Sequence, residues 1–456
     1  MATRKDLLKA HTFVSKRLVA ALVDHDPDDV EHPLRRLGTG TLIGIMISVL
    51  VMAGFGVVGL IKPGNSSNWK TDKTIVIDST AGSLMVFLEG KLYPVPNITS
   101  ARLATGGNTV KSVKPKKLKG TPLEPAIGIA DAPAQLPEPA DLNGFPLRTC
   151  SVAPPTGATD PSRLTTLEIG SGERPAASAS FIAKADGASG AEYLITEGKA
   201  YQMPNHEVSI KLGFSEDQRV RPGNSWLDTI PKGPTLKPLT FEAGDQSQNP
   251  VEGADPTIGT LMEVRTAHGP GAYYVLLRDG LSQISPLESV VLQAEGAESI
   301  PISAAQAGKA LNSQKRHVGA EGMPRSMPQP TPIADPEQST LCATWPSADE
   351  PAEFAVDATA PPVQTQGPDA RQADAVVMPS LTGALFRTAG SVGPDDPGTL
   401  VVDGKRYGIE NADAKAALGY GQVAPVAIPG ELLALVPAGL DPGRTLSIKD
   451  ATQAVS

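Results

Sequence analysis

The longest apolar stretch of the chain covers residues 37–61, and none of its 25 residues is charged. An α-helix rises about 1.5 Å per residue, so a helix of this length reaches across a hydrocarbon core of about 30 Å. Seven basic residues lie before the stretch, against three in the twenty residues after it. The pattern predicts a single transmembrane helix with a cytoplasmic N-terminus. A cleaved signal peptide is the alternative, but the stretch is too long and no cleavage site follows it.

A second helix is predicted ahead of this span, over residues 3–23. Five residues recur at helical spacing on one face, namely Leu7, His11, Val14, Leu18 and Leu22. Thr3 and Asp6 match a capping box at the start of the helix. We therefore expect residues 1–36 to form a cytoplasmic amphipathic helix and tail, whose apolar face packs on a partner helix, another protein or the membrane surface.

Beyond the span, four short segments share an acidic residue followed by glycine, and each lies between runs rich in β-forming residues. Glycine tolerates a positive φ, so each segment predicts a tight β-hairpin. In three copies a tyrosine stands at the third position after the glycine and an asparagine at the seventh. The residues that define the repeat are Gly90, Tyr93 and Asn97, then Gly198, Tyr201 and Asn205, then Gly280, and finally Gly404, Tyr407 and Asn411.

The asparagine stands where a helix can begin, because its side-chain oxygen accepts a free backbone N–H. In the third copy Ser285-Pro286-Leu287-Glu288 predicts a capping box instead. The predicted unit is therefore a strand, a hairpin, a strand and a capped helix. The tyrosines and asparagines are either binding residues or core and cap residues. We favour the second interpretation, because each already has a structural role.

The spacing between these glycines, 108, 82 and 124 residues, is too wide for a solenoid. The fold class predicted is α+β with a mostly β ectodomain: a single N-terminal transmembrane helix, then four small β-hairpin/helix repeats around a central β domain. After the tail (1–36) and the transmembrane helix (37–61), the expected boundaries are 72–120 for repeat 1, 121–180 for the first part of the central domain, 181–240 for repeat 2, 255–312 for repeat 3, 313–372 for the Pro-rich second part of the central domain, and 373–450 for repeat 4.

Composition agrees with small modules, since the 456 residues include 43 prolines and 45 glycines and only 4% are aromatic. The net charge is −9, and the part of the chain beyond the span is acidic. This charge argues against nucleic acid as a partner. Cys150 and Cys342 both fall on the predicted outer side, where thiols oxidise. They most simply form one disulfide, with two unrelated buried thiols as the alternative.

No catalytic, cofactor-binding or metal-ligating residue is predicted. The sequence lacks a G-x-x-x-x-G-K-[ST] loop and a G-x-S-x-G elbow, and His206, His268 and His317 have no partner at metal-ligand spacing. A run of lysines between Lys111 and Lys119 is interpreted as a solvated loop, with contact to an anionic surface as the alternative.

The chain resembles EccB, a membrane component of the type VII (ESX) secretion systems of actinobacteria. The residues that carry the resemblance are 3–5 (TRK), 21–26 (ALVDHD), 32–36 (HPLRR), the span, Trp69, 92–103 (LYPVPNITSARL), 127–133 (IGIADAP) and the P-G…P-x-G endings of the second and fourth copies. The resemblance implies one pass of the cell inner membrane, a periplasmic ectodomain of four repeats around a disulfide-linked core, self-association, and assembly with EccC, EccD and EccE.

Three functions follow as hypotheses. The first is a non-catalytic structural subunit that links the inner-membrane channel of the secretion complex to its periplasmic part. The second is an ATP-hydrolysing subunit, because members of the family are often labelled ATPases, and ATP would then be the cofactor. The third, apart from the resemblance, is an anchored cell-wall-binding protein, although Trp226 and Trp345 are too few to indicate a glycan surface.

Overall fold

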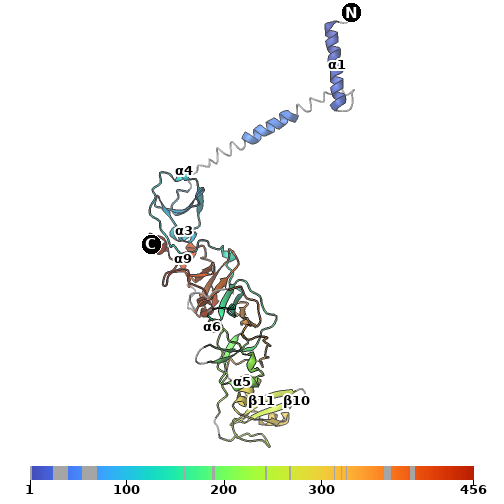
Figure 1. Ribbon diagram of the computed structural model, residues 1–456, viewed down its shortest axis with the longest axis vertical. Helices are drawn as coiled ribbons and strands as arrows, with labels where there is room; N and C mark the ends of the chain where they lie inside the picture. The colour runs from blue at the N-terminus through green and yellow to red at the C-terminus, as the bar shows by residue number, and fades with distance from the viewer. Residues whose placement is uncertain are drawn as a thin grey trace. The chain divides into compact units, whose positions relative to one another are not determined.

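The protein is described from a computed structural model, over residues 3–23, 40–53, 69–158, 160–186, 190–241, 244–266, 269–312, 314–319, 321–324, 326–363, 371–390 and 396–455. The chain divides into two compact units, Met1–Thr71 and Asp72–Ser456. Figure 1 shows the ribbon coloured along the chain.

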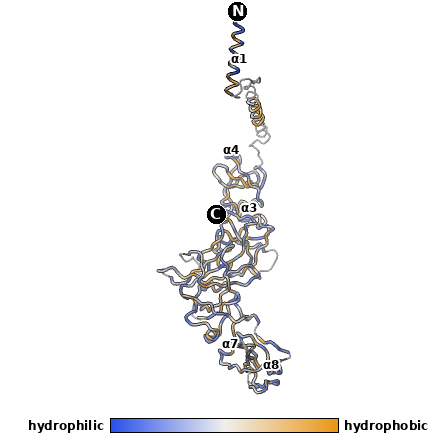
Figure 2. The backbone as a smooth tube through the Cα atoms, turned by 90° about the vertical axis from the view of Figure 1, so that its right-hand side faces the viewer, coloured by the Kyte–Doolittle hydropathy of each residue, from blue (hydrophilic) through white to orange (hydrophobic). Residues whose placement is uncertain are grey.

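The first unit contains α1 (Arg4–Val23) and a helix over residues 40–53. At the start of α1, the carboxylate of Asp6 accepts from the N–H and the hydroxyl of Thr3, which lowers the pKa of that carboxyl. Residues 40–53 are the described part of the predicted span, and Figure 2 colours them hydrophobic. Residues 24–39 and 54–68 lie outside the described ones. Over the part that is described, no helix has both the length and the apolar character needed to cross a membrane, so the span stays a prediction.

Each repeat in the second unit contains more strands than the predicted unit of a strand, a hairpin, a strand and a capped helix. In repeat 1 a three-stranded antiparallel meander leads into a helix, and a fourth strand then returns parallel to the first, giving the order β3-β2-β1-β4. Its elements are β1 (Thr74–Asp78), β2 (Leu84–Leu88), β3 (Lys91–Pro94), α3 (Ile98–Thr105) and β4 (Val110–Val113), followed by the single turn α4 (Pro115–Leu118). The returning strand needs a crossover, which the capped helix supplies.

Repeats 3 and 4 have the same topology, with orders β12-β11-β10-β13 and β19-β18-β17-β20. Repeat 3 consists of β10 (Leu261–Thr266), β11 (Gly269–Leu277), β12 (Gly280–Ile284), α7 (Pro286–Ala294), β13 (Ser299–Ile302) and α8 (Ala304–Ala310). Repeat 4 consists of β17 (Gly383–Thr388), β18 (Thr399–Val402), β19 (Lys405–Gly408), α9 (Ala412–Ala417), β20 (Val426–Ile428), α10 (Gly430–Leu435) and α11 (Ile448–Ala451).

Repeat 2 keeps the meander and the helix but reduces its fourth strand to a single parallel bridge between Ala183 and Val220. Its elements are β7 (Phe181–Lys184), β8 (Glu192–Thr196), β9 (Lys199–Gln202), α5 (His206–Lys211), the short 3₁₀ turn Glu216–Gln218, and α6 (Asn224–Thr229).

The central sheet has the order β15-β14-β5-β6-β16. Its strands are β5 (Leu147–Val152), β6 (Leu164–Ile169), β14 (Leu341–Trp345), β15 (Glu353–Ala355) and β16 (Ala375–Val377). Two segments lie elsewhere than the expected boundaries place them. β16 belongs to this sheet rather than to repeat 4, and residues 123–129 pair with repeat 1 and the C-terminal tail rather than with the central domain. Both pairings join segments far apart in sequence, so no local pattern reveals them.

Shared cores join the modules in a fixed order. Repeat 1 packs on repeat 4 through Leu103 and the tyrosine-containing core of that repeat. Repeats 2 and 4 both pack on the central sheet, in one core that includes Phe181, Leu147 and Phe386. Repeat 3 contacts repeat 2 through α7 against α5. Along the ribbon of Figure 1, repeats 1 and 4, the central sheet, repeat 2 and repeat 3 therefore follow one another in contact.

Candidate functional site

The acidic-Gly turns of repeats 1, 2 and 4 share one backbone conformation. Both turn residues have positive φ, for example 48° at Glu89 and 82° at Gly90. Such a turn matches the right-handed twist of the two strands it joins, which is why glycine is needed at its second position. In repeat 3 only Gly280 has positive φ, at 120°, so that turn is of another type.

Two of these turns contact the central sheet at its opposite edges. A Cβ built on Gly198 would lie 2.6 Å from Cβ of Pro351, two residues before edge strand β15. A Cβ on Gly404 would lie 3.3 Å from the carbonyl oxygen of Val376 in edge strand β16. The turn of repeat 1, at Gly90, has nothing within 4 Å. The glycines of repeats 2 and 4 thus allow close docking that covers the sheet edges, where unpaired strands are prone to association.

The asparagines of the repeat are N-caps. Oδ1 of Asn97, Asn205 and Asn411 accepts from the backbone N–H three residues on, at 2.8, 3.2 and 2.9 Å. In repeat 3, Ser285 and Glu288 form both bonds of a capping box. Asn97 is also a connector, because its side-chain amide donates to the carbonyl of Ile129 at 2.7 Å.

The tyrosines of the repeat differ in burial, because a residue far along the chain packs on the ring in only two of the copies. Tyr201 and Tyr407 are buried, whereas Tyr93 is half-buried. Each ring in the buried pair covers a glycine: a Cβ on Gly233 would lie 2.3 Å from Tyr201, and one on Gly439 would lie 2.2 Å from Tyr407. Burial raises the pKa of both phenols.

Those glycines belong to a segment that returns to the outer edge of each meander. It forms a parallel bridge to the third strand in all four copies, at Leu123, Lys232, Leu311 and Ala438. In repeat 1 the position of the glycine is taken by Glu124, which pairs with Lys91 at 2.8 Å. The recurrence of P-x-G was the signal for this packing, but its partner, the tyrosine ring, lies 32 residues earlier in both copies.

The lysines after the turn glycines do not form a phosphate cradle. Each of Lys91, Lys199 and Lys405 is the first residue of a strand, whereas phosphate binding uses converging N–H groups at a helix start. The carboxylate of Glu124 raises the pKa of Lys91. Over the residues described, no group of three or more potential metal ligands occurs.

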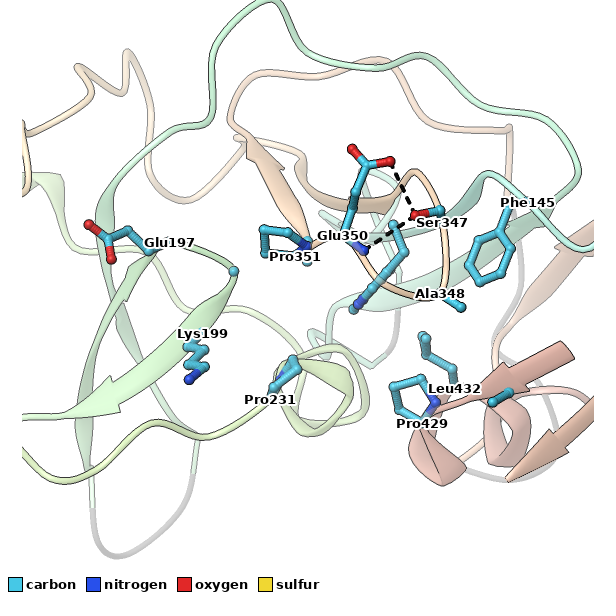
Figure 3. A pocket seen from close by; sticks show the side chains of 14 residues that line it. Phe145, Glu197, Lys199, Pro231, Ser347, Ala348, Glu350, Pro351, Pro429 and Leu432 are labelled. Carbon is cyan, nitrogen blue, oxygen red and sulfur yellow. Dashed lines mark hydrogen bonds between the residues drawn. The ribbon is translucent and has the colours of Figure 1, made fainter. Parts of the chain in front are cut away.

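Lys199 lines a pocket of about 190 Å³ where repeat 2, the β14–β15 loop and repeat 4 meet. Figure 3 shows Pro231, Pro351 and Pro429 converging on it from these three modules. Its carboxylates already have partners, since Glu350 accepts from Ser347 Oγ at 3.1 Å and Glu197 accepts from Ser326 Oγ at 2.7 Å. The bond from Ser347 to Glu350 belongs to a local turn, since the N–H of Glu350 donates back to Ser347 Oγ at 3.3 Å. The pocket lies at a junction between modules.

Both ring nitrogens of His206 contact side chains of the same repeat. Its Nε2 contacts Glu216 and its Nδ1 lies 2.7 Å from the guanidinium of Arg219. A guanidinium only donates, so Nδ1 accepts and Nε2 carries the hydrogen. His317 pairs its backbone with Gln283 in repeat 3, and His268 lies outside the described residues.

Cys150 and Cys342 are joined by a disulfide and face each other across β5, the middle strand of the central sheet, and its neighbour β14. The bond closes a sequence separation of 192 residues. The structure therefore decides for one disulfide and against two free thiols.

Comparison with known proteins gives a family over the whole length. Residues 1–455 match the family model described as type VII secretion system ESX-1, transport TM domain B (EccB). Among curated relatives, the ESX-1 secretion system ATPase EccB1 of Mycobacterium tuberculosis is 24% identical, covering 96% of this chain and 92% of its own length. The ESX-3 secretion system ATPase EccB3 of the same species is 28% identical, covering 96% of this chain and 87% of its own.

Two solved structures share the fold. A chain of an intact ESX-5 inner membrane complex matches all of this chain and 96% of its own, with a TM-score of 0.63 and 22% identity. A chain of an EccB3 dimer from the ESX-3 core complex matches 83% of this chain and 100% of its own, with a TM-score of 0.64 and 22% identity.

Proposed function

This chain belongs to the EccB family of the type VII secretion systems, and on that premise we propose that it is a non-catalytic structural subunit of an ESX membrane complex. It would anchor the complex and link the inner-membrane channel to the periplasmic part. The observation that carries the proposal is the use of the repeated residues. The glycines occupy turns, the buried tyrosines fill cores and the asparagines cap helices, so the repeat builds a scaffold.

The membrane topology in this proposal is a single pass at residues 37–61, with the N-terminus in the cytoplasm and residues 72–456 in the periplasm. The helical, apolar residues 40–53 and the basic residues before them support it. So do two similar structures, one of an intact ESX-5 inner membrane complex and one of the periplasmic assembly from that complex.

The proposed partners are EccC, EccD and EccE, together with a second copy of this chain. Self-association is supported by the similar structure described as an EccB3 dimer. We propose no cofactor, no nucleic acid and no cell-wall ligand for this protein.

Hydrolysis of ATP is the competing function, because the curated relatives are named ATPases. The purified full chain should hydrolyse ATP no faster than a Lys91→Ala, Lys199→Ala, Lys405→Ala triple variant. Saturable turnover that one point substitution abolishes would overturn the structural role and favour the ATPase.

Topology and assembly have separate tests. Alkaline phosphatase fused after Ser100 should be active, and fused after Pro33 inactive; the reverse pattern rejects the orientation. The full chain should co-purify with the other membrane components, and its isolation as a lone protein from cells that express them would reject membership of the complex.

A further inference from the structure

Repeat 1 ends in a basic face. Lys111 in β4, Lys114 and Lys119 on either side of α4, and Lys116 within α4 are exposed. The segment 106–123 that carries them contains no acidic residue. We refer to these four lysines as the basic face.

The charge of the second unit is concentrated here. Residues 72–120 contain eight basic and three acidic residues, a net charge of +5. Residues 121–456 contain 23 basic and 40 acidic residues, a net charge of −17. A basic face on an otherwise acidic unit marks a surface that attracts anions.

The fold places this face away from the rest of the unit. Repeat 1 contacts its neighbours through α3, which packs against α9 and α11. Figures 1 and 2 both show α4 at the end of repeat 1 opposite α3. Lysines that are only a run in the sequence therefore form the free end of the module.

The four lysines also lack a carboxylate partner among the described residues, in contrast to Lys91, which pairs with Glu124 in the same repeat. Their exposed positions in β4 and around α4 leave the ammonium groups able to reach an external anion. A cluster of lysines without carboxylate partners, at the free end of a module, is more typical of a surface that docks on an anion than a neutralised cluster is.

The chain is also short between the apolar stretch and repeat 1. Eleven residues separate Ile61 from Lys73, so even when fully extended they reach about 40 Å. Any membrane that residues 37–61 cross is thus held close to repeat 1, which raises the effective concentration of headgroups at its surface.

We propose that the basic face of repeat 1 docks on anionic phospholipid headgroups of the membrane that carries the span. This inference rests on the single-pass topology proposed above. The docking would orient repeat 1, and with it the row of modules that repeat 4 continues, relative to the membrane plane. Electrostatic attachment of lysines to anionic lipid is screened by salt over about 10 Å.

The test uses the full chain in nanodiscs of phosphatidylcholine alone and of phosphatidylcholine with one third phosphatidylglycerol. Lysine acylation by an N-hydroxysuccinimide ester is followed by mass spectrometry, and hydrogen exchange of residues 106–123 by the same instrument. At 50 mM salt we expect the basic face to react at least about threefold more slowly in the anionic discs. The difference should vanish at 0.5 M salt.

A matched control uses exposed lysines in the other repeats, Lys237, Lys309, Lys315 and Lys405, whose rates should be equal in both discs. Charge reversal of the basic face to glutamate should abolish the slower hydrogen exchange in anionic discs, whereas charge reversal of the four control lysines should preserve it. Equal acylation rates in both discs, for a chain that has inserted, overturn the docking.

Two further outcomes separate this inference from its premise. Protection of the basic face that depends on protein concentration in pure phosphatidylcholine would indicate that the face binds the acidic surface of a second copy. That result would overturn the proposed docking on lipid. A chain that fails to insert into either disc rejects the proposed topology itself.

Discussion

Repeats 2 and 4 are two copies of one unit, and the half that contains the hairpin is the same in both. The N–H of Ala200 donates to the carbonyl of Pro231 at 2.9 Å, and the N–H of Arg406 donates to that of Pro437 at 2.8 Å. The ring of Tyr201 covers Gly233, and the ring of Tyr407 covers Gly439. Each of these glycines stands two residues after the proline. Both hairpin turns then meet an edge of the central sheet.

The returning half differs. Repeat 4 has the strand Val426–Ile428 before Pro429, whereas repeat 2 has only a bridge at Val220 before Pro222. The segment between the glycine after the helix and this proline is one residue shorter in repeat 2, with eight residues against nine. Tyr420 of repeat 4 donates its hydroxyl to the carbonyl of Pro137 at 2.8 Å, where repeat 2 has Phe214.

The comparison shows that the hairpin and the helix cap follow from local sequence, while the returning half adapts to the neighbour of each copy. Repeat 2 donates from the indole of Trp226 to the carbonyl of Thr149 in the central sheet, at 3.1 Å. Repeat 4 instead contributes Leu432 and Leu433 to the same core. The predictions below test the shared half and the divergent half.

The largest effect is expected from loss of the disulfide, because both copies pack on the sheet that it joins. Cys342→Ser should destabilise the second unit by at most about 5 kcal/mol, the chain-entropy value for a loop of this length. Urea unfolding measures the loss, and hydrogen exchange should rise most in β5 and β14 and equally in the two copies. The double variant with Cys150→Ser should cost no more than the single one. Unchanged unfolding would contradict a structural disulfide.

The next effect tests the tyrosine–glycine contacts that the copies share. Gly233→Ala and Gly439→Ala should each cost about 1–3 kcal/mol, because the new methyl would overlap a buried ring. Urea unfolding combined with hydrogen exchange locates the loss in the mutated copy. As a control, Glu124→Ala at the matching position of repeat 1 removes only a surface ion pair and should cost less than either glycine substitution. Equal costs for all three would refute the contact.

The third effect tests the divergent half. Tyr420→Phe should cost about 1–2 kcal/mol, because it leaves the carbonyl of Pro137 unpaired in a buried place. The reciprocal Phe214→Tyr should also destabilise, since it buries a hydroxyl at a position that holds a phenyl ring. A neutral result for both substitutions, measured by thermal unfolding, would show that the two positions are interchangeable.

Removal of the helix cap should destabilise the two copies by nearly the same free energy. Asn205→Ala and Asn411→Ala each remove a bond to an N–H at a helix start, for about 1 kcal/mol, together with an exposed bond from the side-chain amide to a glutamate. Asn97→Ala should cost more, because its second bond, to the carbonyl of Ile129, is buried. Serine at the same positions preserves the cap and serves as the control. If Asn97→Ala costs no more than the others, its second bond contributes nothing.

The smallest effect on stability is expected at alkaline pH. Burial raises the pKa of Tyr420 above its ordinary value of 10.0, so the neutral phenol is favoured in the folded state. Its contribution is fully present below pH 10 and is lost as the pH rises above that value, by less than about 1 kcal/mol at pH 10.5. The Tyr420→Phe variant should lose less stability than the wild type between pH 9 and 10.5. An identical pH profile would mean that the phenol is not protected.

The sequence alone located the four hairpins, the capped helices and the apolar stretch. Each depends on residues close together in the chain. A glycine after an acidic residue allows positive φ, Asn97 reaches an N–H three residues away, and the 25 uncharged residues of the stretch are consecutive. Two cysteines, both after the apolar stretch, allow only one intramolecular pairing, although the sequence does not exclude free thiols.

Only the tertiary structure decided how the copies differ and where they sit. The returning parallel strands, β16 in the central sheet, and the docking of Gly198 and Gly404 at opposite sheet edges join residues far apart in the chain. Tyr93, Tyr201 and Tyr407 stand at the same position of the repeat, but only the latter two meet a glycine. The reason is physical: a side chain is buried by whatever the chain brings back beside it, and a local pattern does not contain that partner.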